Sequence, residues 1–387
     1  MILSRSQHEM RLVKTFSYIL LWIVSISGCF PKNEIQAQKL LIKEESFRKE
    51  LKGKKVDLYT LTNGEGITVQ ITNYGGKIVS IIVPDKNGNL GNVCLGYDSL
   101  DQYLNGSASM GATIGPYANR IADAEFELDG KIYILDKNNG EHTIHGGSAS
   151  FRSMVWDVEK AENNELILSI LSEDGAGGFP GNLRLTVNFS VTPDNELRIH
   201  YHATTDQKTI INFTNHAFFN LAGKDNGDVL RHKLTVNAGA ITPVDETGIP
   251  TGEFLPVEGT PFDFRKSKLI GEDISDDHIQ LKNMRGYDHN YVLDNPDTTL
   301  LHAATLKDPA SGRIMEVYTT EPGLQVYTAN SRRNARKGGK TSGPSSVCLE
   351  TQHFPDSPHH DHFPSCVLEP GREYRSTTVY RFGVEEL

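Results

Sequence analysis

Apolar and polar residues alternate along most of the chain from about Val56 onward. In 183–191 every odd position is apolar, with Arg, Thr, Asn and Ser between them. The turn-forming stretch 193–196 follows, and the same alternation resumes over 197–203. A period of two is typical of a strand with one buried face, so these segments predict an antiparallel hairpin.

Other segments repeat this arrangement. Asp129-Gly130 separates two short apolar runs, and Ala310-Ser311-Gly312 separates the strand-like segments 301–306 and 314–319. Amphipathic helices are scarce, and the best candidate is 98–104 with Asp98 as its cap. Strands joined by polar turns, with no internal linker or fixed repeat, predict an all-β fold: a large antiparallel β-sandwich formed by a single domain over 55–387.

The N-terminus has a different composition. Arg11 and Lys14 precede an apolar run, 16–26, that ends in Ser27-Gly28-Cys29. This order predicts a lipoprotein-type signal peptide over 1–29, with Cys29 lipidated, although an ordinary signal peptide or an uncleaved anchor has similar features. Met10 is an alternative start to Met1 with the same export signal. The prediction is therefore an exported bacterial protein, periplasmic or membrane-anchored through Cys29, with a polar linker over 30–54.

Composition excludes some classes of partner. The formal net charge of −10 disfavours nucleic-acid binding and allows a small neutral substrate. Cys94, Cys348 and Cys366 each lie in or beside an apolar stretch, so buried thiols are expected rather than disulfides. No CxxC pair is present, and a zinc ribbon therefore has no support.

Two ionisable residues stand in apolar surroundings. Glu350 follows Val347-Cys348-Leu349, where loss of solvent raises the pKa of a carboxyl group toward that of a useful base. His216 stands between 210–211 and 218–219, which are Ile-Ile and Phe-Phe, and a histidine can donate a proton near neutral pH. Taken singly, each residue is more often structural than catalytic.

Several motifs, in a fixed order, strengthen the functional interpretation. They are Asn73-Tyr74-Gly75-Gly76, Tyr117-Ala118-Asn119-Arg120, His145-Gly146-Gly147, Gly178-Phe179-Pro180-Gly181, Thr214-Asn215-His216, Gly286-Tyr287-Asp288-His289-Asn290, Pro322-Gly323-Leu324-Gln325, Leu349-Glu350-Thr351-Gln352 and Phe354-Pro355-Asp356. From about Val56 to Phe382 the chain resembles the aldose 1-epimerase family, also called galactose mutarotases. Members of that family adopt a large antiparallel β-sandwich and need no metal or organic cofactor.

The resemblance implies a role for each matching residue. Glu350 corresponds to the catalytic base and His216 to the acid that protonates the ring oxygen, while His145 is a second histidine near the same part of the sugar. The implied hydroxyl-binding residues are Asn119, Arg120, Asp288 and Gln325. Two positions depart from the family pattern: Pro116 stands where arginine is common, and Phe218 where tyrosine is frequent.

The implied activity is interconversion of the α and β anomers of free aldoses by ring opening, rotation about C1–C2 and reclosure. Two alternatives remain: a hexose-6-phosphate 1-epimerase, which needs extra cationic groups, and a lipid-anchored sugar-binding protein without activity. The histidine-rich segment 353–362 contains several prolines and is interpreted as a loop rather than a metal site. The basic cluster 332–337 is interpreted as a solvated loop.

Overall fold

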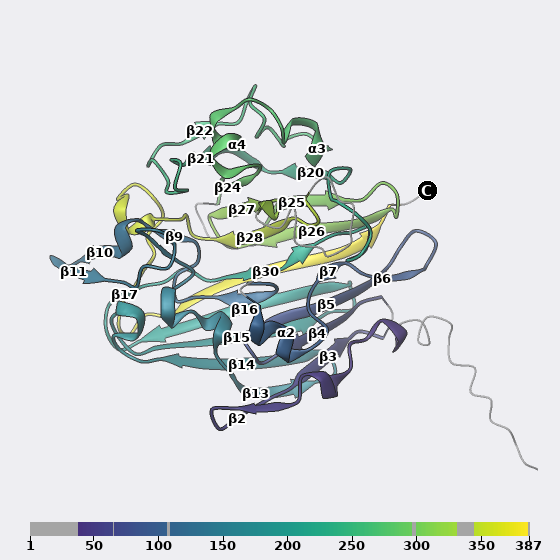
Figure 1. Ribbon diagram of the computed structural model, residues 1–387, viewed down its shortest axis with the longest axis horizontal. Coiled ribbons are helices and arrows are strands. Elements are labelled where there is room, and N and C mark those ends of the chain that lie inside the picture. Colours follow the sequence, from purple (N-terminus) through teal and green to yellow (C-terminus); the bar gives the residue numbers. More distant parts are fainter. Residues whose placement is uncertain (1–37, 65, 107–108, 296–298, 331–343, 386–387) are drawn as a thin grey trace, which may run out of the picture.

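Antiparallel strands are the main secondary structure of the described residues (Figure 1). The computed structural model describes residues 38–64, 66–106, 109–295, 299–330 and 344–385. The predicted signal peptide and the basic cluster 332–337 lie outside the described residues. Among the helices of the described part, none is long and apolar enough to cross a membrane.

Three sheets carry the architecture. The nine-stranded sheet has the order β13 (Asp157–Glu162), β14 (Glu165–Ser172), β15 (Leu183–Val191), β16 (Glu196–Thr205), β30 (Tyr374–Val384), β26 (Arg313–Thr319), β25 (Leu301–Lys307), β20 (Lys233–Val236) and β23 (Lys268–Leu269). The five-stranded sheet has the order β22 (Leu255–Pro256), β21 (Ala238–Thr242), β24 (Asp288–Leu293), β27 (Gly323–Tyr327) and β28 (Cys348–Gln352). The four-stranded sheet is β3 (Leu58–Thr62), β4 (Thr68–Thr72), β5 (Lys77–Pro84) and β6 (Leu90–Asn92).

Two-stranded pairs complete the fold. They are β18 (Thr214–His216) with β8 (Ala112–Ile114), β12 (Thr143–Ile144) with β9 (Arg120–Ile121), β19 (Phe218–Phe219) with β7 (Cys94–Leu95), β10 (Glu125–Leu128) with β11 (Lys131–Ile134), β17 (Thr209–Ile210) with β29 (Val367–Leu368), and β1 (Lys49–Leu51) with β2 (Lys54–Val56). The helices are α2 (Leu100–Asn105), α3 (Ile270–Asp273) and α4 (Ile279–Met284). The sandwich prediction is thus confirmed.

The predicted hairpins are present. In β15 and β16 the odd positions are buried and the even positions partly exposed, and Leu185 pairs with Ala203 in an unbroken register. The two strands at 301–306 and 314–319 are β25 and β26. The helix predicted over 98–104 is α2, which spans Leu100–Asn105. Its N-cap is Ser99 rather than the predicted Asp98, which pairs with Lys224 instead.

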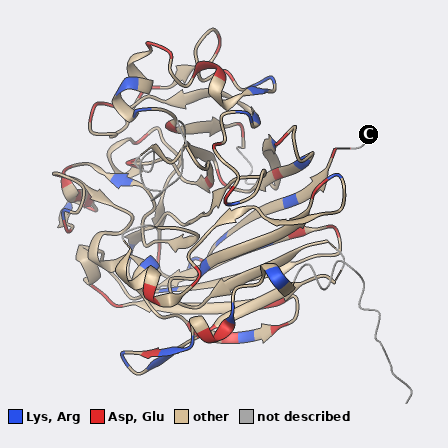
Figure 2. Cartoon of the chain, turned by 45° about the vertical axis from the view of Figure 1, so that its right-hand side comes forward, with Lys and Arg blue, Asp and Glu red and all other residues tan. Residues whose placement is uncertain are grey.

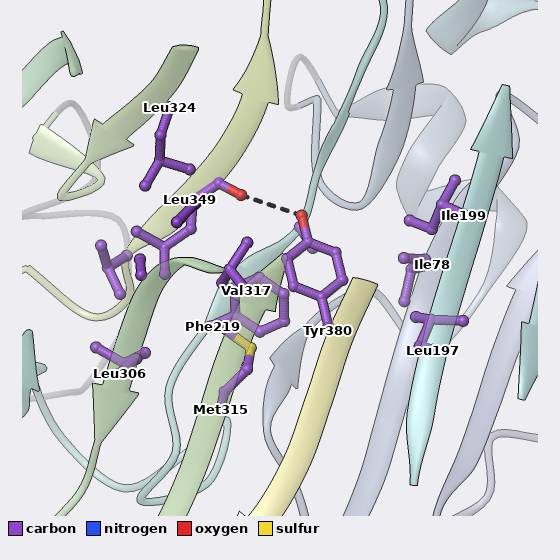
Figure 3. Close-up of a cluster of buried hydrophobic side chains, with 14 of the residues drawn as sticks. Ile78, Leu197, Ile199, Phe219, Leu306, Met315, Val317, Leu324, Leu349 and Tyr380 are labelled. Carbon is purple, nitrogen blue, oxygen red and sulfur yellow. Dashed lines mark hydrogen bonds between the residues drawn. The ribbon is translucent and has the colours of Figure 1, made fainter. Parts of the chain in front are cut away.

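The core is formed by side chains of all three sheets, and Figure 3 shows part of it. Leu324 and Leu349 point into it from β27 and β28, and Val317 from β26. Tyr380 of β30 packs among them, and its hydroxyl donates to the backbone oxygen of Leu349 at 3.0 Å. Since side chains alternate along a strand, the residues next to Leu324 and Leu349 face away from this core.

The described residues that precede the domain pack against it. Phe47 is fully buried, and Ile42 exchanges two hydrogen bonds with the buried side chain of Gln70. Lys49 and Lys54 form ion pairs with acids of the domain, in keeping with the interspersed positive and negative residues of Figure 2. The lysine- and glutamate-rich stretch predicted to be a polar linker over 30–54 therefore has apolar side chains that pack onto the sandwich from Ile42 onward. We call residues 42–56 the N-terminal arm.

Candidate active site

A pocket of about 540 Å³ opens beside β24, β27 and β28, a size typical of small-ligand sites. Six of the seven residues that the sequence singled out line it, namely Asn119, Arg120, His145, His216, Asp288 and Glu350. They come from separate strands and turns, so the pocket exists only once the sheets have packed together.

Glu350 stands in the middle of β28, on the face opposite the core. Its neighbour Leu349 points into the core, and the strand period therefore turns Glu350 toward the pocket. The side chain is only 2 % exposed. Burial, reinforced by the charge of Asp288 and opposed by that of Arg120, raises the pKa of Glu350 well above the usual range. The carboxylate is consequently a much stronger base than one in water.

His216 reaches the same point from β18. Its Nε2 lies 3.7 Å from Oε1 of Glu350, and both side chains are buried. The imidazole stacks on Phe218, with ring centroids 4.8 Å apart and planes 16° apart, and Tyr327 meets it edge-on. These aromatic neighbours restrict the ring to one orientation, so that a proton donor and a base face the same small volume.

His145 and Asn119 hold one another through their backbones. Both residues adopt left-handed conformations, with φ of 53° and 63°. The His145 N–H donates to the Asn119 oxygen at 3.0 Å, and the Asn119 N–H donates to Nδ1 of His145 at 3.1 Å. Because Nδ1 accepts, the neutral ring carries its proton on Nε2.

The ring of His145 stays neutral across ordinary pH. Burial, helped by the nearby charges of His216, Arg152 and Arg120, lowers the pKa of His145 well below the usual value. His145 lies close to His216, with ring centroids 5.4 Å apart. It can therefore donate one hydrogen bond from Nε2 to a polar ligand.

Arg120 is fixed by the neighbouring turns. Its Nε donates to Oδ1 of Asn139 at 3.0 Å and its Nη1 to Oδ1 of Asn119 at 3.3 Å. Gly248, with φ of +85°, lies against the guanidinium group, where any added Cβ would be 2.9 Å from Cζ. Glycine at 248 thus leaves space for the arginine, and the guanidinium is held ready to bind oxygen atoms.

Asp288 and Gln325 form a pair across β24 and β27. The Gln325 amide donates to Oδ1 of Asp288 at 2.7 Å. Burial raises the pKa of Asp288, while Arg120 and this hydrogen bond act in the opposite direction. Gln325 is 3 % exposed and is not among the residues lining the pocket, and its amide donates to Asp288, which does line it. A direct hydroxyl contact of Gln325 stays a prediction.

The two departures from the family pattern lie close to the site. Pro116 lies under the His145-Gly146 turn, because a Cβ added to Gly146 would be 2.8 Å from its Cδ. Phe218 is the ring that stacks on His216. Neither position contributes a proton-transfer group.

Sequence reasoning missed the outer part of the pocket. These lining residues are Asn139, Ile144, Glu246, Thr247, Asn283, Met284, Arg285, Tyr327 and Asn330. Most stand in turns or at a helix end, where polar residues are ordinary and give no distinguishing signal. Arg285 illustrates this, since it caps α4 with φ of 58°.

The histidines of 353–362 each have a nearby partner, and His359 and His360 share Asp356. His353 pairs with Glu321 at 2.6 Å, His359 with Asp356 at 2.6 Å, and His362 contacts the backbone oxygen of Gly252. Among the described residues, one group has metal-binding geometry, and it lies elsewhere: His216 and Glu350, which line the pocket, together with the buried Cys348. The segment 353–362 is thus stabilised by local pairs.

The family model described as aldose 1-epimerase matches residues 57–381, most of the 387-residue chain. This chain belongs to the aldose 1-epimerase family. Galactose mutarotase from Bos taurus is 40 % identical over 321 residues, which cover 82 % of this chain and 92 % of the bovine one. Aldose 1-epimerase from Escherichia coli K12 is 36 % identical over 337 residues, covering 86 % and 97 %.

Solved structures agree with the aldose 1-epimerase assignment. An aldose epimerase homologue from C. elegans superposes with a TM-score of 0.78 at 29 % identity, covering 86 % of this chain and 100 % of its own. Galactose 1-epimerase from Lactobacillus acidophilus gives a TM-score of 0.76 at 28 % identity, covering 87 % and 97 %. The family's sandwich and the polar pocket thus occur together in this chain.

Proposed function

We propose that this member of the aldose 1-epimerase family interconverts the α and β anomers of free aldoses of the glucose and galactose type. One observation carries the proposal. A buried carboxylate with a strongly raised pKa lies 3.7 Å from an imidazole in a pocket of sugar size. Opening a cyclic hemiacetal requires one group to remove a proton and another to supply one, and this pair provides both.

The reaction begins with Glu350 as carboxylate and His216 protonated. Glu350 accepts the proton of the C1 hydroxyl, the C1–O5 bond breaks as the C1 carbonyl forms, and His216 Nε2 gives its proton to O5. Rotation about C1–C2 presents the other face of the aldehyde. His216 then takes back the O5 proton as O5 attacks C1, and Glu350 returns a proton to O1. No proton is gained or lost over the cycle.

The remaining residues hold the sugar. His145 donates from Nε2, Arg120 and Asn119 bind hydroxyl oxygens, and Asp288 accepts a hydroxyl proton. Fixing the rest of the ring confines movement to the C1 end, which lowers the entropic part of the barrier. Gln325 acts through Asp288, whose carboxylate it orients.

Polarimetry tests the proposal directly. Fresh α-D-glucose and α-D-galactose are mixed with purified residues 30–387 and with the Glu350→Gln and His216→Asn variants. Equilibration well above the spontaneous rate, lost in both variants, is expected. Folded protein that binds these sugars without accelerating equilibration would indicate a sugar-binding protein, and acceleration restricted to glucose 6-phosphate would indicate a hexose-phosphate epimerase.

We also propose that the protein is exported and anchored through lipid on Cys29. Support comes from the order of basic residues, apolar run and small residues before Cys29. Labelled palmitate should enter the wild-type protein expressed in a bacterium and should be absent from Cys29→Ser, which should leave the membrane fraction. Full-length, unlabelled wild-type protein in the cytosol would contradict this part of the proposal.

A further inference from the structure

A thiol lies beside the proposed acid–base pair. Cys348 precedes Glu350 by two residues on β28, so both side chains are on the same face of the strand, where Glu350 lines the pocket and Cys348 is buried beside Phe218. One ligand atom from each of His216, Cys348 and Glu350 lies within 4.8 Å of the other two. These side chains are 6 %, 0 % and 2 % exposed. None of the steps of anomer exchange uses the thiol.

The three groups form a recognised set of metal ligands. Sulfur, imidazole nitrogen and carboxylate oxygen together suit Zn²⁺ and its heavier relative Cd²⁺, which prefer tetrahedral sites. Zinc bonds of about 2.0–2.3 Å separate tetrahedral ligands by roughly 3.3–3.8 Å. The His216 Nε2 and Glu350 Oε1 atoms are 3.7 Å apart, so an approach of a few tenths of an ångström brings them to the roughly 3.3–3.4 Å of tetrahedral nitrogen and oxygen ligands. The sulfur needs a shift of at most about 1 Å, within reach of a side-chain rotation.

A second observation points to a ligand at this place. Oε2 of Glu350 is buried and has no hydrogen-bond partner among the described residues. Buried carboxylate oxygens are nearly always paired with a donor or a cation. Asp288 adds negative charge close to Glu350, which favours a cation, while Arg120 opposes it.

We propose that His216, Cys348 and Glu350 form an inhibitory binding site for Zn²⁺ and similar soft divalent cations. The Cys348 S–H proton is released to solvent as the metal–sulfur bond forms, and no electron is transferred. The metal occupies His216 Nε2 and the Glu350 carboxylate, so it excludes the sugar from the same groups. The inhibitory part of this inference rests on the proposed epimerase function, whereas metal binding does not.

Cadmium titration tests binding alone. Cadmium added to the purified protein should produce the ultraviolet thiolate-to-cadmium absorption at one metal per chain, and galactose should displace it. The matched variants are Cys348→Ser and Cys366→Ser. Burial raises the pKa of the Cys366 thiol to about 12, and that residue packs in a different cluster, so it serves as the control.

The Cys348→Ser variant should lose the absorption and at least about a hundredfold in cadmium affinity, while Cys366→Ser should match the wild type. Absorption that persists in Cys348→Ser, or that galactose leaves unchanged, would overturn the site. The absence of any cadmium binding to folded wild-type protein would also overturn it.

Kinetics then test inhibition. Zinc should slow anomer equilibration competitively with galactose, EDTA should reverse the effect, and residual activity of Cys348→Ser should resist zinc at least about a hundredfold better than that of Cys366→Ser. Non-competitive inhibition, or equal sensitivity of the two variants, would overturn the inference. A protein that binds cadmium through Cys348 but lacks epimerase activity would instead refute the proposed function and leave the metal site standing.

Discussion

Two pairs of adjacent strands, β15–β16 and β27–β28, show how the same backbone geometry serves different purposes. In β15 the apolar residues are buried and the intervening polar residues are at least partly exposed. In β28 all five residues are buried, although the last three, Glu, Thr and Gln, are polar. Side chains alternate between the two faces in both strands. Only in β15 does one of these faces meet bulk water.

The difference lies in what the second face of each strand contacts. The outer face of β15 meets solvent, where a polar group has no desolvation cost. The second face of β28 meets an enclosed pocket, where Glu350 is buried and its pKa is strongly raised. Burying such a group lowers stability, so its presence indicates a function that outweighs the loss. Substitutions in β15 should therefore affect stability, and those in β28 should affect rate.

The largest effect is expected for Glu350→Gln. Its kcat/KM for anomer equilibration should fall by about a hundred- to ten-thousandfold, because the base is removed. The melting temperature should not fall, because a neutral amide replaces a buried carboxyl group of similar shape. Polarimetry and thermal unfolding on one sample give both values. A large loss of stability would show that Glu350 is mainly structural and would remove the contrast between the strands.

Phe189→Ala in β15 should have the opposite outcome. The side chain is fully buried, so its truncation should lower the free energy of unfolding by about 3–5 kcal/mol. The kcat/KM of the folded fraction should stay at the wild-type value. Thr186→Ala, on the outer face of the same strand, is the control and should change stability by less than about 0.5 kcal/mol. Urea unfolding measures both.

The next largest effect is expected from breaking the buried pair of His353 and Glu321, neither of which lines the proposed active-site pocket. Burial acts to raise the pKa of Glu321, but His353 and further hydrogen bonds outweigh it and lower that pKa. Burial likewise acts to lower the pKa of His353, and Glu321 outweighs it and raises that pKa. His353→Gln should therefore cost about 1.5–3 kcal/mol of stability without changing kcat.

The directions of the Glu321 and His353 pKa shifts define the pH range in which His353→Gln loses stability. The Glu321 contribution is present above its unfolded pKa and is lost as the pH falls through its folded pKa. The His353 contribution is present below its unfolded pKa and is lost as the pH rises through its folded pKa. The stability difference between wild type and His353→Gln should thus peak between about pH 4.5 and 6.5. A difference that is flat with pH would contradict the pairing.

The smallest effect is a shift in the pH profile. Glu350 acts as a base only when it is deprotonated, so kcat/KM should increase as the pH rises through its pKa. The charge of Asp288 raises that pKa, and Asp288→Asn should move the acid limb to lower pH. Arg120→Met should move it to higher pH, because Arg120 lowers the same pKa. Shifts in the same direction for both variants would contradict the electrostatic account.

Alternation made the sandwich predictable from sequence, since β15, β16, β25 and β26 each bury one face and carry clear turn signals. The pocket was predictable only through motif resemblance, because its residues come from segments far apart in the chain. Gln325 shows the limit: a motif indicates that the residue matters, but only the packing shows that its amide donates to Asp288. Arg285 had no signal, since its position depends on how the end of α4 is capped.

The N-terminal arm also determines how the domain carries a mechanical load. A pull on the N-terminal side is received first by the paired hydrogen bonds between Ile42 and Gln70, and by the buried ring of Phe47. From there the force passes into the sheet that contains β4. Every residue lining the pocket lies at Asn119 or later in the chain. The arm nevertheless shares a hydrophobic cluster with Phe218, which stacks on His216, so a load at this end is also transmitted to one wall of the pocket.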